Sequence, residues 1–176
     1  LVDALATRLA GLERGGQGRG YSRDLAAALA FLRGRALLDR TTVAGADAAA
    51  VEFEESITKD PGFAAAHAAL YDARLQAASL RRIGLAEART RNAPLLARAF
   101  ELDPEGGAAL LARARWSEAS AAAREADFRR GLELEPSNSR GINGYAEFLQ
   151  REGRAAESSR WLDRELLVDP LSAPAH

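Results

Sequence analysis

Residues 139–170 read SRGINGYAEFLQREGRAAESSRWLDRELLVDP, and this stretch decides the fold of the chain. Its apolar residues recur three or four positions apart, which is the period of an amphipathic helix. Gly153 divides them into two groups, and Asp169-Pro170 ends the second group, because proline cannot continue a helix. The stretch therefore predicts two helices joined by a turn. The apolar residues are Ile142, Tyr145, Ala146 and Leu149 in the first helix and Trp161, Leu162 and Leu166 in the second.

The same ending recurs along the chain. The four prolines that follow an acidic residue lie 43, 32 and 34 residues apart, and no segment between them alternates in the manner of a strand. Such a recurrence, with helices in between, is typical of a helical repeat array. We expect the second unit to hold about nine extra residues as an extended or additional helical turn around residues 78–92. The expected helix pairs span residues 23–61, 62–104, 105–136 and 137–170.

Counted from Ser139, the small and apolar residues of the first helix occupy positions 4, 7, 8 and 11, and Gly153 occupies position 15. This spacing resembles the tetratricopeptide repeat (TPR), a helix pair of about 34 residues. Ala146 stands at position 8, where the family has a small residue that lets the two helices pack closely. The resemblance implies an all-α fold, a right-handed superhelix of stacked antiparallel helix pairs (a TPR-like α-solenoid) whose concave face binds a protein or peptide.

A narrower resemblance comes from residues 31–40 (FLRGRALLDR), residues 60–67 (DPGFAAAH) and the long second unit. These resemble the C-terminal TPR region of bacterial membrane-linked adenylate cyclases and winged-helix transcriptional activators, over residues 23–172. The resemblance implies the sensory or interaction segment of a larger bacterial regulatory protein, facing the periplasm. An amphipathic helix such as residues 2–12 also precedes the first repeat in that group.

The two ends of the chain carry further expectations. Residues 1–14 are expected to form an accessory helix, and residues 15–22 a glycine-rich linker. Residues 171–176 are typical of the start of a truncated further helix. Because the sequence contains no methionine, we expect it to be part of a longer protein. Trp161 is expected to face a following unit or a second copy of the chain, which predicts either more repeats or a homodimer.

Composition excludes several classes of function. Lys and Arg total 24 and Asp and Glu total 25, so we expect no nucleic-acid surface. The absence of cysteine and the presence of only two histidines argue against a metal site, and no cofactor is expected. No apolar run approaches the roughly 18 residues of a membrane span, so we expect no membrane insertion by this segment. Gly16, Gly18 and Gly20 lack the preceding strand that a phosphate-binding loop needs, and we interpret them as linker.

The first helix of each pair supplies the candidate binding residues. Position 9 of successive units carries alternating charge: Arg35, Asp72, Arg115 and Glu147. This alternation is compatible with a polar track for a peptide. An intramolecular charge ladder explains the alternation as well and is the favoured interpretation, since the axes of adjacent helices lie about 8–10 Å apart. In the last unit, the residues that share this face are Arg140, Asn143, Glu147 and Gln150. The family resemblance implies that Asn143 bonds a peptide backbone, whereas the lysine and asparagine clamp for a C-terminal carboxylate is missing.

Other polar residues have simpler interpretations. His67 lies on the apolar side of its helix and is interpreted as a packing residue. Ser137 and Ser139 are expected to cap a helix start, and Glu125 and Arg129 to pair four residues apart. No catalytic triad, paired carboxylates or metal cluster can be assigned, so the chain is not expected to be an enzyme. The sequence thus predicts a protein-binding scaffold. The alternative is a self-association or spacer module that regulates an attached catalytic or DNA-binding domain.

Overall fold

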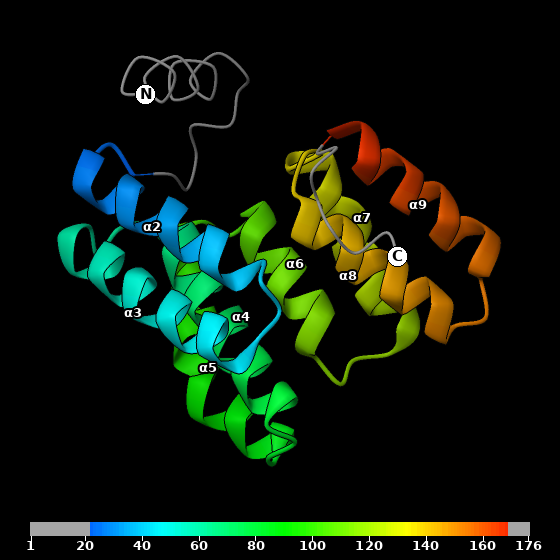
Figure 1. Cartoon of the computed structure of the whole chain (residues 1–176), viewed down its shortest axis with the longest axis horizontal. Coiled ribbons are helices and arrows are strands. Elements are labelled where there is room, and N and C mark those ends of the chain that lie inside the picture. The colour runs from blue at the N-terminus through cyan, green and yellow to red at the C-terminus, as the bar shows by residue number, and fades with distance from the viewer. Residues whose placement is uncertain (1–21, 169–176) are drawn as a thin grey trace. The chain divides into compact units, whose positions relative to one another are not determined.

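The computed structural model describes residues 22–168 of the chain (Figure 1). Within this range the structure contains eight α-helices and no strand, so the prediction of an all-α fold is confirmed. The chain divides into two compact units, unit 1 up to Gly106 and unit 2 from Gly107 onward. The accessory helix expected over residues 1–14, nearly all of the expected linker and the further helix expected from residue 171 lie outside the described residues.

Unit 1 contains four helices, each packed on the next one in the chain. α2 (Leu25–Leu38) packs on α3 (Val43–Lys59), α3 packs on α4 (Ala64–Leu80), and α4 packs on α5 (Leu85–Leu102). Each connection in this unit is four residues long, and connections this short make consecutive helices antiparallel neighbours. The extra residues around 78–92, expected as an extended or additional helical turn, lie mostly in the ends of α4 and α5, but residues 81–84 break the helix between them.

Unit 2 repeats this arrangement with shorter helices. α6 (Gly107–Trp116) packs on α7 (Ala121–Leu134), and α8 (Ser139–Arg151) packs on α9 (Ala155–Val168). α8 also contacts both α6 and α7, so the two pairs of this unit share one core. The turn before α9 passes through Gly153, whose φ of +76° lies in the left-handed region that favours glycine.

Local sequence signals set the ends of these helices. The acidic residues before the prolines, Asp60, Asp103 and Glu135, are the C-terminal caps of α3, α5 and α7. The caps predicted at Ser137 and Ser139 were wrong: α8 begins after Asn138, whose Oδ1 accepts a hydrogen bond of 2.9 Å from the Gly141 amide. An asparagine carbonyl reaches this amide as well as a serine hydroxyl does, so neither neighbouring serine is needed as the cap.

Three phenylalanines form the centre of unit 1. The ring of Phe31 on α2 lies 5.7 Å from that of Phe53 on α3 and 4.8 Å from that of Phe63, which precedes α4. A Cβ atom at Gly34 would lie 2.5 Å from Cε1 of Phe53, so the ring occupies the space that a side chain at residue 34 would need. The two helices therefore approach closely because residue 34 is glycine.

The core of unit 2 follows the same principle. Phe128 of α7 stacks on Tyr145 of α8, with ring centroids 5.3 Å apart. Leu111 of α6 lies against two glycines, since a Cβ at either Gly131 or Gly141 would come within 2.7 Å of its side chain. One leucine is thus enclosed by α7 and α8 at positions where neither helix has a side chain.

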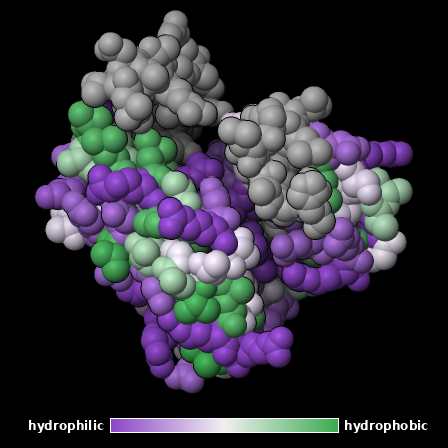
Figure 2. All heavy atoms as spheres, viewed as in Figure 1, coloured by the Kyte–Doolittle hydropathy of each residue, from purple (hydrophilic) through white to green (hydrophobic). Residues whose placement is uncertain are grey.

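The surface of unit 1 carries exposed apolar residues. Figure 2 shows hydrophobic atoms in green at several places on this surface, among them a group over α2. Among the described residues, the exposed large hydrophobic side chains are Leu25, Leu32, Val51, Leu80 and Ile83. No helix of the described range is long and apolar enough to cross a lipid bilayer.

We predict that Gly131→Ala destabilises the protein by about 1–3 kcal/mol, the usual cost of overpacking a core. The sign of this stability change is informative, because in a helix interior without such a contact alanine is favoured over glycine by about 1 kcal/mol. Urea unfolding followed by circular dichroism measures the difference. Gly84→Ala is the control, since the nearest atom to its Cβ would lie 3.8 Å away. A Gly131→Ala variant as stable as the wild type would contradict the packing described here.

Candidate functional site

α6 and α8 contact each other, and Arg115 at the end of α6 reaches across to α8. Its Nη1 donates a hydrogen bond of 3.4 Å to the carbonyl oxygen of Arg140, and its Nη2 lies 4.0 Å from Oε1 of Glu147. Its guanidinium carbon lies 5.6 Å from the centre of the Trp116 ring. The Arg115 side chain is consequently only 17% exposed although it is charged.

Gly144 provides the space that Arg115 occupies. A Cβ at this position would lie 3.4 Å from Nη1 of Arg115 and 3.3 Å from the ring of Phe128. The guanidinium therefore lies over a bare stretch of the α8 backbone. Its ion pair with Glu147 is long and half-exposed, and pairs of this kind contribute little stability.

The outer face of α8 continues this polar surface. Asn143 is half-buried, whereas Glu147 and Gln150 are exposed, and the three residues recur at helical spacing on one stripe. Glu147 also pairs with Arg151 at 3.2 Å. We call the residues of this surface the α6/α8 polar face, and they are Arg115, Arg140, Asn143, Glu147 and Gln150.

The two remaining candidates belong to unit 1. Arg35 of α2 is half-buried, and Asp72 of α4 is buried, with 7% of its surface exposed. The structure thus brings Arg115, Arg140 and Glu147 together within unit 2. The Arg115–Glu147 pair has the geometry of one step in the charge ladder that the alternating signs predicted.

Trp161 of α9 is half-buried and packs inside unit 2. Its ring meets the Tyr145 ring edge-on, with centroids 5.2 Å apart and an interplanar angle of 65°. This contact places part of the indole against the core of its own unit. Self-association through Trp161 stays a prediction. His67 is buried, and its Nε2 lies 3.1 Å from the carbonyl oxygen of Pro61, as expected for a packing residue.

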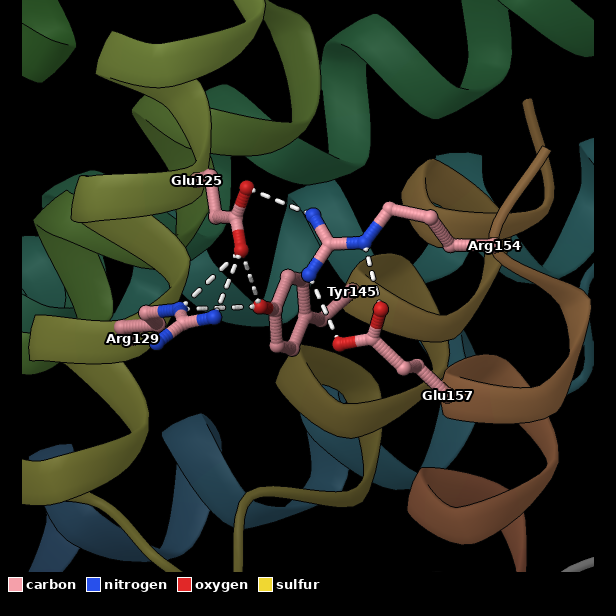
Figure 3. A network of polar contacts seen from close by, with 5 residues as sticks. All are labelled: Glu125, Arg129, Tyr145, Arg154 and Glu157. Carbon is pink, nitrogen blue, oxygen red and sulfur yellow. Dashed lines mark hydrogen bonds and ion pairs between the residues drawn. The ribbon is translucent and has the colours of Figure 1, made fainter. Parts of the chain in front are cut away.

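A second polar cluster joins α7, α8 and α9 (Figure 3). Glu125 of α7 accepts hydrogen bonds from Arg129 (2.8 Å), Tyr145 (2.9 Å) and Arg154 (2.7 Å). Arg154, at the start of α9, also donates two bonds of 2.7 Å to Glu157. We call this cluster the Glu125 network.

These contacts and burial shift the pKa values of Glu125, Glu157 and Tyr145. Hydrogen bonds to the carboxylate, led by that from Arg154, lower the pKa of Glu125 from 4.5 to about 2, against the opposing effect of burial. Hydrogen bonding to Arg154 also lowers the pKa of Glu157, whereas burial raises the pKa of the Tyr145 phenol. The carboxylates of Glu125 and Glu157 are therefore ionised at neutral pH and the Tyr145 phenol is protonated, so charge-assisted bonds hold the three helices together.

Sequence reasoning found only the Glu125–Arg129 pair of this network. The contacts of Glu125 with Tyr145 and Arg154 span 20 and 29 residues, and no local pattern indicates them. Their role is structural, since each member is bonded to another. Within the described residues, no group of three or more His, Asp or Glu side chains has an arrangement that could hold a metal ion.

Comparison of the sequence with protein-family models and with curated proteins gives no match. The candidate site is therefore defined by its geometry alone. It is a face of two helices on which guanidinium, carboxylate and amide groups alternate, with the chemistry to donate and accept hydrogen bonds.

We predict that Glu125→Gln lowers the free energy of unfolding by about 1–3 kcal/mol at pH 7, because three donors lose an anionic acceptor. The pKa of Glu125 is depressed in the folded state, so its contribution is present above about pH 4.5 and is lost as the pH falls toward 2. The difference between variant and wild type should shrink over that window in urea unfolding at several pH values.

Glu133→Gln is the matched control on the same helix. Its carboxylate pairs with Arg130 at 3.1 Å and is 64% exposed, so its loss should change stability by less than about 0.5 kcal/mol. A Glu125→Gln effect that is equally small, or constant between pH 7 and pH 3, would contradict the assigned role of the network.

Proposed function

We propose that this chain is a TPR-like scaffold that binds a protein or peptide through the α6/α8 polar face. Consecutive helices pack in pairs with connections of three or four residues, and acidic residues followed by proline end three of the second helices. These features support a helical repeat, and a stack of such pairs extends naturally into a right-handed superhelix.

The observation that carries this proposal is the position of Arg115. Its guanidinium lies over Gly144 and beside the exposed carboxylate of Glu147, so donors and an acceptor are placed side by side on one helix face. A side chain already restricted in this way loses little conformational freedom on binding. Its planar donors suit the carbonyl or carboxylate groups of a peptide.

The polar stripe of α8 supplies complementary groups. In the proposed complex, the amides of Asn143 and Gln150 donate to and accept from a peptide backbone, and Glu147 accepts from its N–H groups or pairs with a basic side chain. The weak Arg115–Glu147 pair costs little to exchange for such bonds. Peptide binding and the charge ladder are therefore two states of one surface.

In this account the chain performs no catalysis itself. It acts as the sensory or interaction segment of a larger bacterial regulatory protein, in line with the resemblance of residues 31–40 and 60–67. Self-association or a spacer role in such a regulator is the alternative function. Light scattering over a range of concentrations tests for self-association, because a chain that stays monomeric at every concentration does not self-associate.

The test uses residues 1–176 as bait in a bacterial lysate and compares the wild type with Arg140→Ala/Asn143→Ala/Glu147→Ala. We predict that the triple variant loses at least about tenfold in affinity for a captured partner, equivalent to about 1.4 kcal/mol, and keeps its helical circular dichroism. Calorimetric titration with the purified partner measures the affinity.

The matched control is Arg130→Ala/Glu133→Ala, which removes an exposed ion pair from α7 of the same unit. It should bind the partner as the wild type does. Equal capture by the triple variant and the wild type would overturn the proposed role of the α6/α8 polar face.

A further inference from the structure

α2 is apolar on two opposite faces. Its inward face packs inside unit 1, through Ala27, Ala30, Phe31 and Leu38. On the outward face Leu25 is 59% exposed and Leu32 is 40% exposed. A helix that is apolar all round is normally covered on every side. The outward stripe, which we call the α2 stripe, consists of Leu25, Leu29, Leu32 and Ala36 at helical spacing.

The other large apolar side chains that are exposed in the described range do not form such a stripe. Val51 is 64% exposed on α3, but Asp47 and Glu54 lie beside it at helical spacing and pair with arginines of α4. Leu80 and Ile83 lie at the end of α4 and in the turn after it. Among the described residues of unit 1, the α2 stripe is therefore the apolar surface that extends over about three turns of a helix.

One flank of the α2 stripe carries a charge of each sign. Asp24, the N-cap of α2, uses its Oδ1 to accept a hydrogen bond of 2.9 Å from the Ala27 amide. Among the described residues, neither its Oδ2 nor the half-buried Arg35 side chain has a hydrogen bond or an ion pair. Asp24 and Arg35 lie about three helical turns apart, so both are on the same flank of the stripe. A flank with opposite charges at its two ends is complementary to itself when reversed.

A second copy of the chain therefore has the surface that fits the α2 stripe. When two copies of one helix pack antiparallel about a two-fold axis, the same flank of each copy meets and every contact occurs twice. If Asp24 of one copy lies level with Arg35 of the other, Leu29 of one copy lies beside Leu29 of the other. Leu32 then lies between Leu25 and Leu29 of the other copy, as a side chain of one packed helix lies in a groove of its neighbour.

The same register brings no like charges together. Arg33, on the other flank of the α2 stripe, would lie level with Ala26 of the other copy. Arg33 already pairs with Glu52 at 2.8 Å and with Glu55 at 3.6 Å on α3 of its own chain. Burial of the leucines would supply the main driving force, and the two opposite charges of the first flank would set the direction and register.

We propose that two copies of this chain associate through their α2 stripes, antiparallel, with Asp24 of each copy paired to Arg35 of the other. One helix face on each side buries less surface than an obligate dimer does, so the dimer is reversible and depends on concentration. This inference goes beyond the proposed function, because the residues of the α6/α8 polar face take no part in it. It locates self-association on α2, whereas the sequence pointed to Trp161.

Sedimentation equilibrium of the full chain tests for this dimer. We expect the average mass to rise with concentration from that of one chain toward that of two. Leu25→Glu/Leu32→Glu should weaken the association at least about tenfold, because charges would replace buried leucines. This variant should stay folded, since both side chains are largely exposed in one chain. Arg35→Glu should also weaken the association at least about tenfold, because it would place two carboxylates side by side at Asp24.

Because the chain has no cysteine, single introduced cysteines test the direction of the contact. Leu29→Cys lies beside its counterpart in the proposed dimer and should form a disulfide between two chains on mild oxidation. Ala36→Cys would lie about 20 Å from its counterpart along the helix axis, which is too far for a disulfide. We expect the disulfide of Leu29→Cys to form at least about tenfold faster than that of Ala36→Cys.

Val51→Glu and Arg82→Glu are the matched controls, because they change an exposed apolar residue and an exposed arginine of the same unit. Both should associate as the wild type does. A chain that is monomeric at every concentration would overturn the proposal and leave the α2 stripe to a different partner. Unchanged association of Leu25→Glu/Leu32→Glu, or equal disulfide rates at residues 29 and 36, would overturn it as well.

Discussion

The close approach of neighbouring helices at glycine is the constraint on which both units depend. In unit 1 the Phe53 ring fills the space beside Gly34, and in unit 2 Leu111 fills the space beside Gly131 and Gly141. A large side chain in one helix and none in the next fix both the distance and the relative position of the pair. Because the connections are only three or four residues long, the helices of a pair have little remaining freedom to shift relative to each other.

Buried polar groups then fix the pairing of the helices. Ser56 of α3 donates to the carbonyl oxygen of Ala27 on α2, and Ser158 of α9 donates to that of Ala146 on α8, each at 2.9 Å. Buried hydroxyls of this kind are costly unless their partner is in place, so they disfavour a slipped arrangement. In unit 2 the charged hydrogen bonds of the Glu125 network also fix the pairing of the helices.

The same network supports the proposed binding surface. Tyr145 lies on the side of α8 that faces α7 and α9, where it bonds Glu125 and contacts Trp161. Asn143 and Glu147 lie two residues to either side of it in sequence, which places them on the opposite side of the helix. One side of α8 is therefore held by the core, while the other presents its polar groups on a rigid element.

Local sequence predicts where most helices of this fold end, but it does not predict which residues of different helices contact each other. Acidic residues before proline mark the ends of α3, α5 and α7, because proline cannot continue a helix. The break between α4 and α5 was missed, since apolar spacing continues through Leu80, Ile83 and Leu85.

The candidate site was predictable only in part. The polar stripe of α8 follows from helical spacing, because its members are three or four residues apart. The position of Arg115 over Gly144 depends on how α6 packs on α8, and the burial of Asp72 depends on its neighbours in space. Periodicity indicates which residues share a face, but it does not indicate how much of that face the tertiary structure covers.

The most direct test of this account is a double-mutant cycle at residues 34 and 53. In the wild type, Gly34→Ala should lower the free energy of unfolding by about 1–3 kcal/mol, because its Cβ would overlap the Phe53 ring. In a Phe53→Leu background the same change should cost almost nothing, or stabilise through helix propensity, by up to about 1 kcal/mol. An equal cost in both backgrounds would contradict the claim that this contact sets the spacing of the helix pair.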